Sequence, residues 1–298
     1  MIFRPPRALG VIVGAFFTAW ALGVFALALS VSVGAPPGWK SFLGWLVAAG
    51  SLLLAGAFAY WTASIARLSY RVERGALVIT WGWRRVVVPL DTIQRLVPGR
   101  TVEAPAIEGL SWWGCHVGHA ELPRLGYVLF FATHAEPEEL VYVVTSGECY
   151  ALTVQDQAAF AEAVQGRVRL SPVSPIPHRA FASGMAAMPF WRDRSAMLWA
   201  VGLAAAAAAV AGYVLIRYPG LPEVVRLSYP EFGGHVRIGT KSELLRIAYL
   251  AAGIGSANLL AGALVHARDR ASGLWILAGG VLIELVLLGA AVSAIARA

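Results

Sequence analysis

The pattern of hydrophobic and polar positions divides the chain into long apolar segments on either side of one polar stretch. A helix needs about 20 apolar residues to cross the hydrocarbon core of a bilayer, so uncharged runs of that length indicate membrane spans. Five runs fit this pattern, at residues 8–35, 41–66, 195–216, 247–266 and 271–296, the last with Glu284 as its only ionisable group. The pattern therefore predicts five transmembrane α-helices, and the first two form a hairpin because only a short polar segment separates them.

Residues 68–90 follow a different pattern, in which apolar and polar positions alternate. Alternate side chains of a β-strand lie on opposite faces of its sheet, so this alternation predicts strands. Short turns at "ERG", where Gly75 is able to take a positive φ, and at "GW" divide the stretch into three antiparallel strands. Further strands are expected at residues 126–133, 140–145 and 149–153.

Two segments complete the polar stretch. Residues 98–125 contain four glycines and three prolines without a sustained period, which predicts a long loop. Thr153 and Asp156 have the spacing of a capping box at the start of an amphipathic helix that ends near residue 168. The expected fold class is therefore an α+β membrane protein, in which a small β-barrel or sandwich closed by a C-terminal helix is inserted between membrane helices.

Composition and charge support this division and predict an orientation. Hydrophobic residues make up 58% of the chain and charged residues 14%, with a mean hydropathy of +0.66. Arginines precede the first span, follow the second and fill the last short loop, and positive residues favour the cytoplasmic side. We therefore expect the N-terminus and residues 68–170 to be cytoplasmic, with 171–194 as a linker and 217–246 as an extracytoplasmic loop in a cell membrane.

The net charge of +7 fits a protein whose main partner is the lipid bilayer. No dense basic stripe is present, so nucleic acid is not an expected partner, whereas a protein partner or a second copy of the chain is. Cys115 and Cys149 fall in the expected cytoplasmic region, where thiols are reduced.

The stretch "YRVERGALVITWGWRRVVVPLDTIQRL" resembles the start of a bacterial pleckstrin-homology-like (PH-like) domain, and "ALTVQDQAAFAEAV" resembles the closing helix of that family. The resemblance covers about residues 60–170. It implies a β-sandwich or barrel with a C-terminal helix, which is generally non-enzymatic, often tethered to a bacterial membrane and without a settled ligand. The basic cluster that eukaryotic relatives use for phosphoinositides does not carry over, because only Arg84 and Arg85 lie near a comparable hairpin and no lysines accompany them.

A second resemblance covers residues 219–246, where "LPEVVRLSYPEFGGHVRIGTKSELLR" is similar to a segment of SdpI-like integral membrane proteins. His235, Arg237 and Lys241 are the candidate residues of this external loop. The family's histidine position holds Ser228 or a neighbour, and His235 lies later in the chain, so a role that depends on histidine does not carry over.

Aromatic and basic residues at predicted turns and loops are the candidates for contact with a ligand or the membrane surface. Tryptophan favours the headgroup level of a bilayer, and the pair in "SWWG" could either insert there or close the mouth of the barrel. The candidates are Trp81, Trp83, Arg84, Arg85, Trp112 and Trp113.

Glu284 is unusual because it lies near the middle of the last span, where a charged side chain costs roughly 3 kcal/mol. Asn258 lies near the middle of the preceding antiparallel span, so the two could meet and hydrogen-bond. This pattern favours a polar clasp between two helices, and the alternative is a proton or cation pathway in a small transporter or an envelope signal sensor.

Motifs for metal binding and catalysis are weak. "CHVGH" offers Cys115, His116 and His119, with His134 later, but no second motif supplies the standard spacing of a zinc site. Neither a nucleophile elbow nor a glycine-rich phosphate loop with its lysine is present. The sequence therefore predicts no metal, no cofactor and no enzymatic activity, and favours a membrane-anchored binding or regulatory protein.

Overall fold

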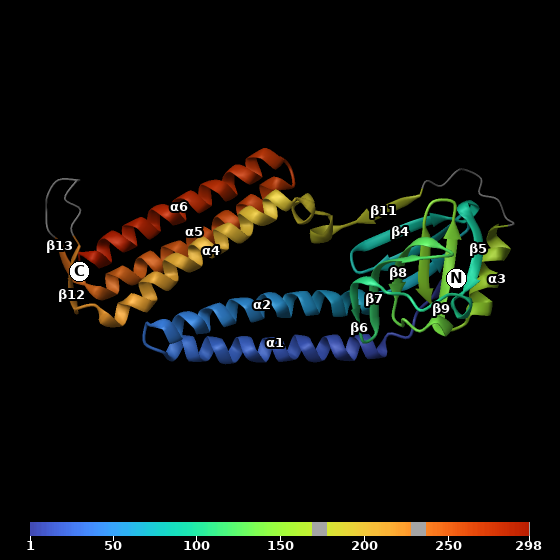
Figure 1. Ribbon diagram of the computed structural model, residues 1–298, viewed down its shortest axis with the longest axis horizontal. Helices are drawn as coiled ribbons and strands as arrows, with labels where there is room; N and C mark the ends of the chain where they lie inside the picture. The colour runs from blue at the N-terminus through green and yellow to red at the C-terminus, as the bar shows by residue number, and fades with distance from the viewer. Residues whose placement is uncertain (169–177, 228–236, 298) are drawn as a thin grey trace. The chain divides into compact units, whose positions relative to one another are not determined.

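The structure of the chain is a computed structural model that describes residues 1–168, 178–227 and 237–297 (Figure 1). It forms two compact units: the first contains Met1–Ala21 and Leu53–Ala187, and the second contains Leu22–Leu52 and Met188–Ala298.

Five helices are long and apolar enough to cross a membrane, as the hydropathy pattern predicts. Each lies within two residues of an expected span at both ends. Their backbones need no partner in lipid, because a helix satisfies its own backbone hydrogen bonds. They are α1 (Ala8–Gly34), α2 (Trp39–Ala66), α4 (Arg194–Arg217), α5 (Leu245–His266) and α6 (Arg270–Ala296).

The first unit contains two β-sheets that face each other. The five-stranded sheet has the order β1 (Ile2–Phe3), β2 (Ser69–Val72), β3 (Ala76–Trp81), β4 (Arg84–Pro89) and β11 (Arg179–Ala182). The six-stranded sheet has the order β5 (Ile93–Pro98), β9 (Leu140–Thr145), β10 (Cys149–Thr153), β8 (Gly126–Ala132), β7 (Cys115–Leu122) and β6 (Glu108–Trp112). All neighbours are antiparallel except β10 and β8, which are parallel.

The alternating stretch 68–90 forms the expected three strands. One face of each strand is buried, with the residues Leu68, Tyr70, Val72, Leu77, Ile79, Trp81, Val86, Val88 and Leu90. The turn geometry is different from the expectation. The positive φ falls on Gly82 (φ 58°) in the second turn, and Gly75 is not among the described glycines with positive φ. The second turn is thus the one that requires glycine.

The expected loop at 98–125 was a wrong prediction, because β6 and β7 form a hairpin within it. Gly109 pairs with Gly118 across the two strands, and a Cβ built at Gly109 would lie only 2.8 Å from Gly118 Cα. The glycines that suggested a loop therefore allow two strands to approach closely.

The core of the sandwich draws on both sheets and on α3 (Gln157–Val168), which lies on the side away from α1 and α2 (Figure 1). Phe160 and Val164 of α3 are buried in this core. The Tyr70 hydroxyl donates to the Phe131 carbonyl oxygen at 2.6 Å and so links the two sheets.

The capping box predicted for α3 was wrong in its first member. Asp156 itself caps the helix, because its carboxylate accepts from the Ala159 backbone N–H at 2.8 Å. Thr153 belongs to β10, and its hydroxyl accepts from the backbone N–H groups of Thr133 and His134. The Thr153 hydroxyl oxygen thus accepts hydrogen bonds from the backbone that follows β8 and does not cap the helix.

The chain forms a strand of the five-stranded sheet both before α1 and after α2. β1 precedes α1 and pairs antiparallel with β2, which follows α2 after two residues. The Met1 amino group donates to the Val72 carbonyl oxygen at 3.0 Å, and the Arg7 guanidinium donates to the Ala66 carbonyl oxygen. The chain therefore passes twice between the sheet and the helices, from β1 to α1 and from α2 to β2, and we call these two connections the chain crossings.

Part of the segment expected to be a linker, 171–194, extends the same sheet. β11 pairs with β4, and the Ser183 backbone N–H donates to the Trp83 carbonyl oxygen at 2.9 Å. Residues 169–177 lie outside the described part of the chain.

In the second unit, α4, α5 and α6 pack against one another, and a cluster of polar side chains joins three of their ends. Asp193 caps α4 through the Ser195 and Ala196 N–H groups. Its Oδ2 also lies 3.0 Å from Nε2 of the buried His266 and 2.6 Å from Nε of Arg270. The Arg270 guanidinium, followed by the His266 ring, holds the pKa of the Asp193 carboxyl well below its usual range.

This cluster predicts a pH-dependent stability for the bundle. A carboxyl whose pKa is lower in the folded state stabilises it above the unfolded pKa of about 3.9, and that contribution is lost as the pH falls. Asp193→Asn keeps the cap but loses the ion pair. The unfolding temperature of the wild type should therefore exceed that of the variant at neutral pH, and the difference should shrink as the pH approaches about 3.

Asp269→Asn is the matched control, because Asp269 caps α6 through the Ala271 and Ser272 N–H groups. Asparagine caps nearly as well as aspartate, so this variant should unfold close to the wild type. Thermal unfolding of the purified protein in detergent measures both, and equal behaviour of the two variants at neutral pH would contradict the ion-pair account.

Candidate functional site

Two hairpin tips of the β-domain pack on α1 and α2 within the first unit. The tip between β3 and β4 contacts Tyr60 of α2, whose ring centroid lies 6.2 Å from that of Trp81 and 5.3 Å from that of Trp83. Between the two tryptophans, Gly82 sits so close to Ser64 that a built Cβ would overlap the hydroxyl. Glycine at this turn therefore permits both the positive φ and the contact with the helix.

The tip between β6 and β7 makes the larger aromatic contact. The Trp112 ring stacks on Phe17 of α1 and Phe58 of α2, with centroid distances of 5.9 and 5.6 Å, and meets Trp61 edge-on at 5.4 Å. Next to it, Gly114 takes φ 77° and lies against Gly10 of α1, where neither residue leaves room for a Cβ. Aromatic pairs in these geometries contribute about 0.5–1.5 kcal/mol each beyond burial.

A cavity of about 560 Å³ lies beside this second tip. Leu9 and Phe17 of α1 and the two tryptophans of the tip give it an apolar side. Its polar side consists of Ser111, His116, Thr133, His134 and Glu136.

The histidines of the cavity are held by hydrogen bonds. His116 Nδ1 lies 2.9 Å from the Ser111 hydroxyl, and His134 Nδ1 lies 3.1 Å from the Thr133 hydroxyl and 3.2 Å from Glu139 Oε2. Burial lowers the pKa of His116, the Glu136 charge raises it and His134 lowers it. The net direction is downward, so the His116 ring is neutral at pH 7.

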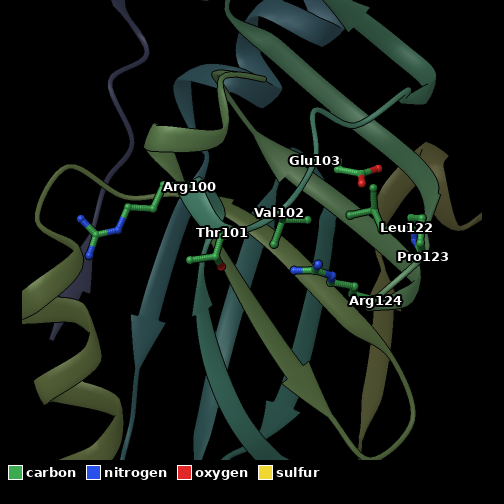
Figure 2. Close-up of a pocket in the computed structure, with 7 residues that line it drawn as sticks. All are labelled: Arg100, Thr101, Val102, Glu103, Leu122, Pro123 and Arg124. Carbon is green, nitrogen blue, oxygen red and sulfur yellow. The ribbon is translucent and has the colours of Figure 1, made fainter.

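A smaller cavity of about 260 Å³ lies at the turn between β7 and β8 and is shown in Figure 2. Arg124 extends toward Thr101 and Val102, whereas Arg100 points away from them. Glu103 lines the same cavity, so the lining carries a negative charge as well as the positive charge of Arg124.

The structure brings three of the six predicted surface candidates, Trp81, Trp83 and Trp112, into contact with the helix pair. Trp81 is buried, Trp112 is half-buried, and Trp83 and Trp113 are exposed, the last to 70%. The two arginines, Arg84 and Arg85, are exposed on β4, and Arg85 lies 3.7 Å from Glu73.

The helix residues that receive the tips were not among the predicted site residues. Gly10, Phe17 and Phe58 lie inside apolar runs, where composition gives no reason to separate them from lipid-facing positions. Tyr60, near the end of a span, carried a usable signal, because tyrosine favours the headgroup level.

The predicted hydrogen bond between Asn258 and Glu284 is absent from the described structure. The Asn258 amide donates to the Ile254 carbonyl oxygen of its own helix at 3.0 Å. Its Cβ faces Gly280, one turn before Glu284, and the Glu284 carboxyl lies beside Gly255 instead. Glu284 is 0% exposed, and neither carboxyl oxygen has a hydrogen-bond partner among the described residues.

The candidates of the external loop are only partly described. Residues 228–236, which include His235 and Ser228, lie outside the described residues. The backbone of Arg237 begins strand β13 (Arg237–Thr240), which pairs with β12 (Val224–Leu227). Lys241 Nζ lies 2.8 Å from Glu223 Oε1 and 5.2 Å from the centre of the Tyr218 ring.

The residues of "CHVGH" do not converge. Burial raises the pKa of Cys115 to about 12, and His119 faces Glu108 at 3.3 Å on the exposed side of the hairpin. Cys149, also buried, has its pKa raised to about 12 for the same reason. Within the described ranges, no group of three or more His, Cys, Asp and Glu side chains is placed to hold a metal ion.

A comparison with protein-family models finds a match to the part of the chain that forms most of the two sheets and the closing helix. Residues 68–168 match the family model described as Bacterial PH domain. The match confirms the PH-like part of the sequence prediction and covers β2 to α3. No curated protein and no solved structure matches the chain. The resemblance of residues 219–246 to SdpI-like proteins has no counterpart in these comparisons and stays a prediction.

β1, β11 and the parts of α1 and α2 within residues 8–21 and 53–66 lie outside the matched PH domain but belong to the same compact unit. The candidate site is therefore the junction where the PH domain meets α1 and α2. We call this region, formed by Trp81–Trp83, Trp112–Gly114 and the facing residues of α1 and α2, the helix junction.

The close contact at Gly10 gives a prediction for the helix junction. Gly10→Ala would place a Cβ against the Gly114 carbonyl oxygen and should displace the β6–β7 tip. Gly→Ala in a helix otherwise stabilises by up to about 1 kcal/mol, so destabilisation here would report the lost contact. Limited proteolysis should then cleave near residue 113 faster than in the wild type.

Gly23→Ala is the control on the same helix, because a Cβ at Gly23 would meet nothing within 4 Å. It should leave the proteolysis rate unchanged. Equal rates for Gly10→Ala and the wild type would show that the tip does not rest on α1.

Proposed function

We propose that the protein is a membrane-anchored binding or regulatory protein, which presents its PH domain at the cytoplasmic surface of a bacterial inner membrane. The observation that carries this proposal is the helix junction, where two hairpin tips and two chain crossings hold the PH domain on α1 and α2. A domain fixed in this way keeps one face toward the membrane, whereas a flexible tether would let it turn freely.

Helix length supports a position of the tips near the lipid headgroups. At 1.5 Å per residue, the 27 residues of α1 span about 40 Å, roughly 10 Å more than the hydrocarbon core. Phe17 lies nine residues after the start of α1, and Trp112 stacks on it. The exposed indole rings of Trp83 and Trp113 would then lie where amphipathic rings are favoured.

The charge distribution supports the cytoplasmic side. Arg4 and Arg7 precede α1, and Arg67, Arg71 and Arg74 follow α2, so both ends of the helix pair at the PH domain are basic. Positive residues beside membrane helices are retained on the cytoplasmic side and attract anionic lipids.

Binding is favoured over catalysis by the state of the most nucleophilic side chains. The Cys115 and Cys149 thiols are buried with pKa values raised to about 12, so their thiolates are not available at neutral pH. We therefore assign the PH domain a recognition role, with the bilayer and a protein partner or second copy as its contacts.

Spin labels on the full-length protein in proteoliposomes test this proposal. Single cysteines at positions 113 and 124, in a background of Cys115→Ser and Cys149→Ala, place one label at the helix junction and one at the distant β7–β8 turn. The label at 113 should collide with lipid-soluble oxygen at headgroup depth, and the label at 124 should behave as fully aqueous.

Sidedness is read on the same Arg124→Cys variant with a maleimide that does not cross membranes. Labelling should occur in inverted vesicles and not in intact spheroplasts. Equal aqueous exposure of both spin labels, or labelling of position 124 from outside the cell, would contradict the proposed function.

Glu284 favours a second candidate function, a small transporter or an envelope signal sensor. Its fully buried carboxyl has no partner among the described residues, so the clasp with Asn258 does not explain the cost of placing it in a membrane helix. A proton is the smallest ligand that such a group could exchange, and it needs little space: a Cβ built at Gly255 would lie only 3.2 Å from Glu284 Oε1.

Under this second candidate, wild-type proteoliposomes should dissipate an imposed pH gradient faster than protein-free vesicles, and Glu284→Gln should abolish the difference. Asn258→Ala keeps the carboxyl and serves as the control. Flux that survives in Glu284→Gln, or that is absent from the wild type, would remove the support for a proton pathway.

A further inference from the structure

We propose that the cavity beside the β6–β7 tip binds one phospholipid with a zwitterionic ethanolamine headgroup, its ammonium at Glu136 and its phosphate at His116. The inference deepens the proposed function and rests on it, because the cavity meets lipid only if the helix junction lies at headgroup depth. The sequence assigned no ligand to these two residues.

The cavity combines an apolar side and a polar side, as an amphiphile requires. Leu9 and Phe17 belong to α1, so the apolar side is continuous with a membrane helix. Trp112 and Trp113 extend this side onto the β-domain. Its volume of about 560 Å³ falls within the range of small-molecule sites, which suffices for a headgroup and the start of its acyl chains.

The charges of the lining favour a zwitterion over an anion. Among the residues that the structure describes, Glu136 is the one acidic residue that lines the cavity, and none of the lining residues is a lysine or an arginine. Phosphate groups recognised for their net charge usually meet arginine or lysine, and a carboxylate would repel an anionic headgroup. A primary ammonium donates three hydrogen bonds and pairs well with an exposed carboxylate such as Glu136.

His116 supplies the donor that a phosphate needs without adding charge. The Ser111 hydroxyl can donate to His116 Nδ1 at 2.9 Å, which leaves the ring proton on Nε2. Burial lowers the pKa of His116, so the ring donates this hydrogen bond while neutral. One neutral donor and one carboxylate match the phosphate and the ammonium of a zwitterionic headgroup.

Quaternary ammonium and free headgroups are distinguishable alternatives. Choline cannot donate a hydrogen bond to Glu136, and a glycerol headgroup carries no cation at all. Free phosphoethanolamine has the same ammonium, with a phosphate monoester in place of the diester, but gains nothing from the apolar side that Leu9, Phe17 and the tryptophans form.

The test uses the full-length protein in nanodiscs with a trace of phosphatidylethanolamine that carries a photoreactive diazirine near the start of one acyl chain. Crosslinked peptides should contain residues 9–17 or 111–116. Unlabelled phosphatidylethanolamine should compete roughly tenfold better than phosphatidylcholine or phosphatidylglycerol, since a charge-assisted hydrogen bond distinguishes them. Free phosphoethanolamine should not compete.

Glu136→Gln should reduce the preference for ethanolamine by roughly tenfold, because the amide cannot pair with the ammonium. Glu138→Gln is the matched control, since Glu138 is exposed nearby but does not line the cavity. Equal competition by the three lipids, an unchanged preference in Glu136→Gln, or competition by free phosphoethanolamine would overturn the inference. If the spin label at 113 still reports headgroup depth, only the lipid assignment fails, and the proposed function stands.

Discussion

The pairing of β1 with β2 is the constraint on which the rest of the first unit depends. These strands flank α1 and α2, so their backbone hydrogen bonds fix the two chain crossings side by side at the edge of the same sheet. A flexible linker would let the sheet rotate relative to the helix ends. Here such a rotation would break the backbone hydrogen bonds between β1 and β2. Within the first unit, the PH domain is therefore connected to residues 8–21 of α1 and 53–66 of α2 by paired strands as well as by its hairpin tips.

The candidate binding site lies at the helix junction, where the hairpin tips meet the two helices. Glycines at Gly82 and Gly114 let each tip approach a helix, and the adjacent tryptophans fill the space around them. The arrangement places apolar rings and hydrogen-bonding side chains around one cavity beside α1. Recognition at a membrane surface needs this combination, since a headgroup is polar and the chains below it are not.

Much of the fold could be predicted from the sequence because its strongest patterns are local. Uncharged runs predict helices, and the alternation in 68–90 predicts strands. The β6–β7 hairpin was missed because its facing glycines, Gly109 and Gly118, read as loop residues until the partner strand is known. Tryptophans could be selected as site candidates, but their helix partners could not, since Phe17 and Phe58 look like any lipid-facing residue. The predicted contact between Asn258 and Glu284 was wrong. A similar depth in the membrane does not determine which turn of the neighbouring helix a side chain faces, and Asn258 faces Gly280 instead.

A pulsed electron paramagnetic resonance distance between labels at positions 53 and 124 tests the central claim most directly. Leu53 is an exposed residue of α2, Arg124 lies in the β7–β8 turn, and both belong to the first unit. A PH domain held by β1, β2 and the helix junction predicts one narrow distance distribution in proteoliposomes. A broad distribution, as a flexibly tethered domain would give, would contradict it.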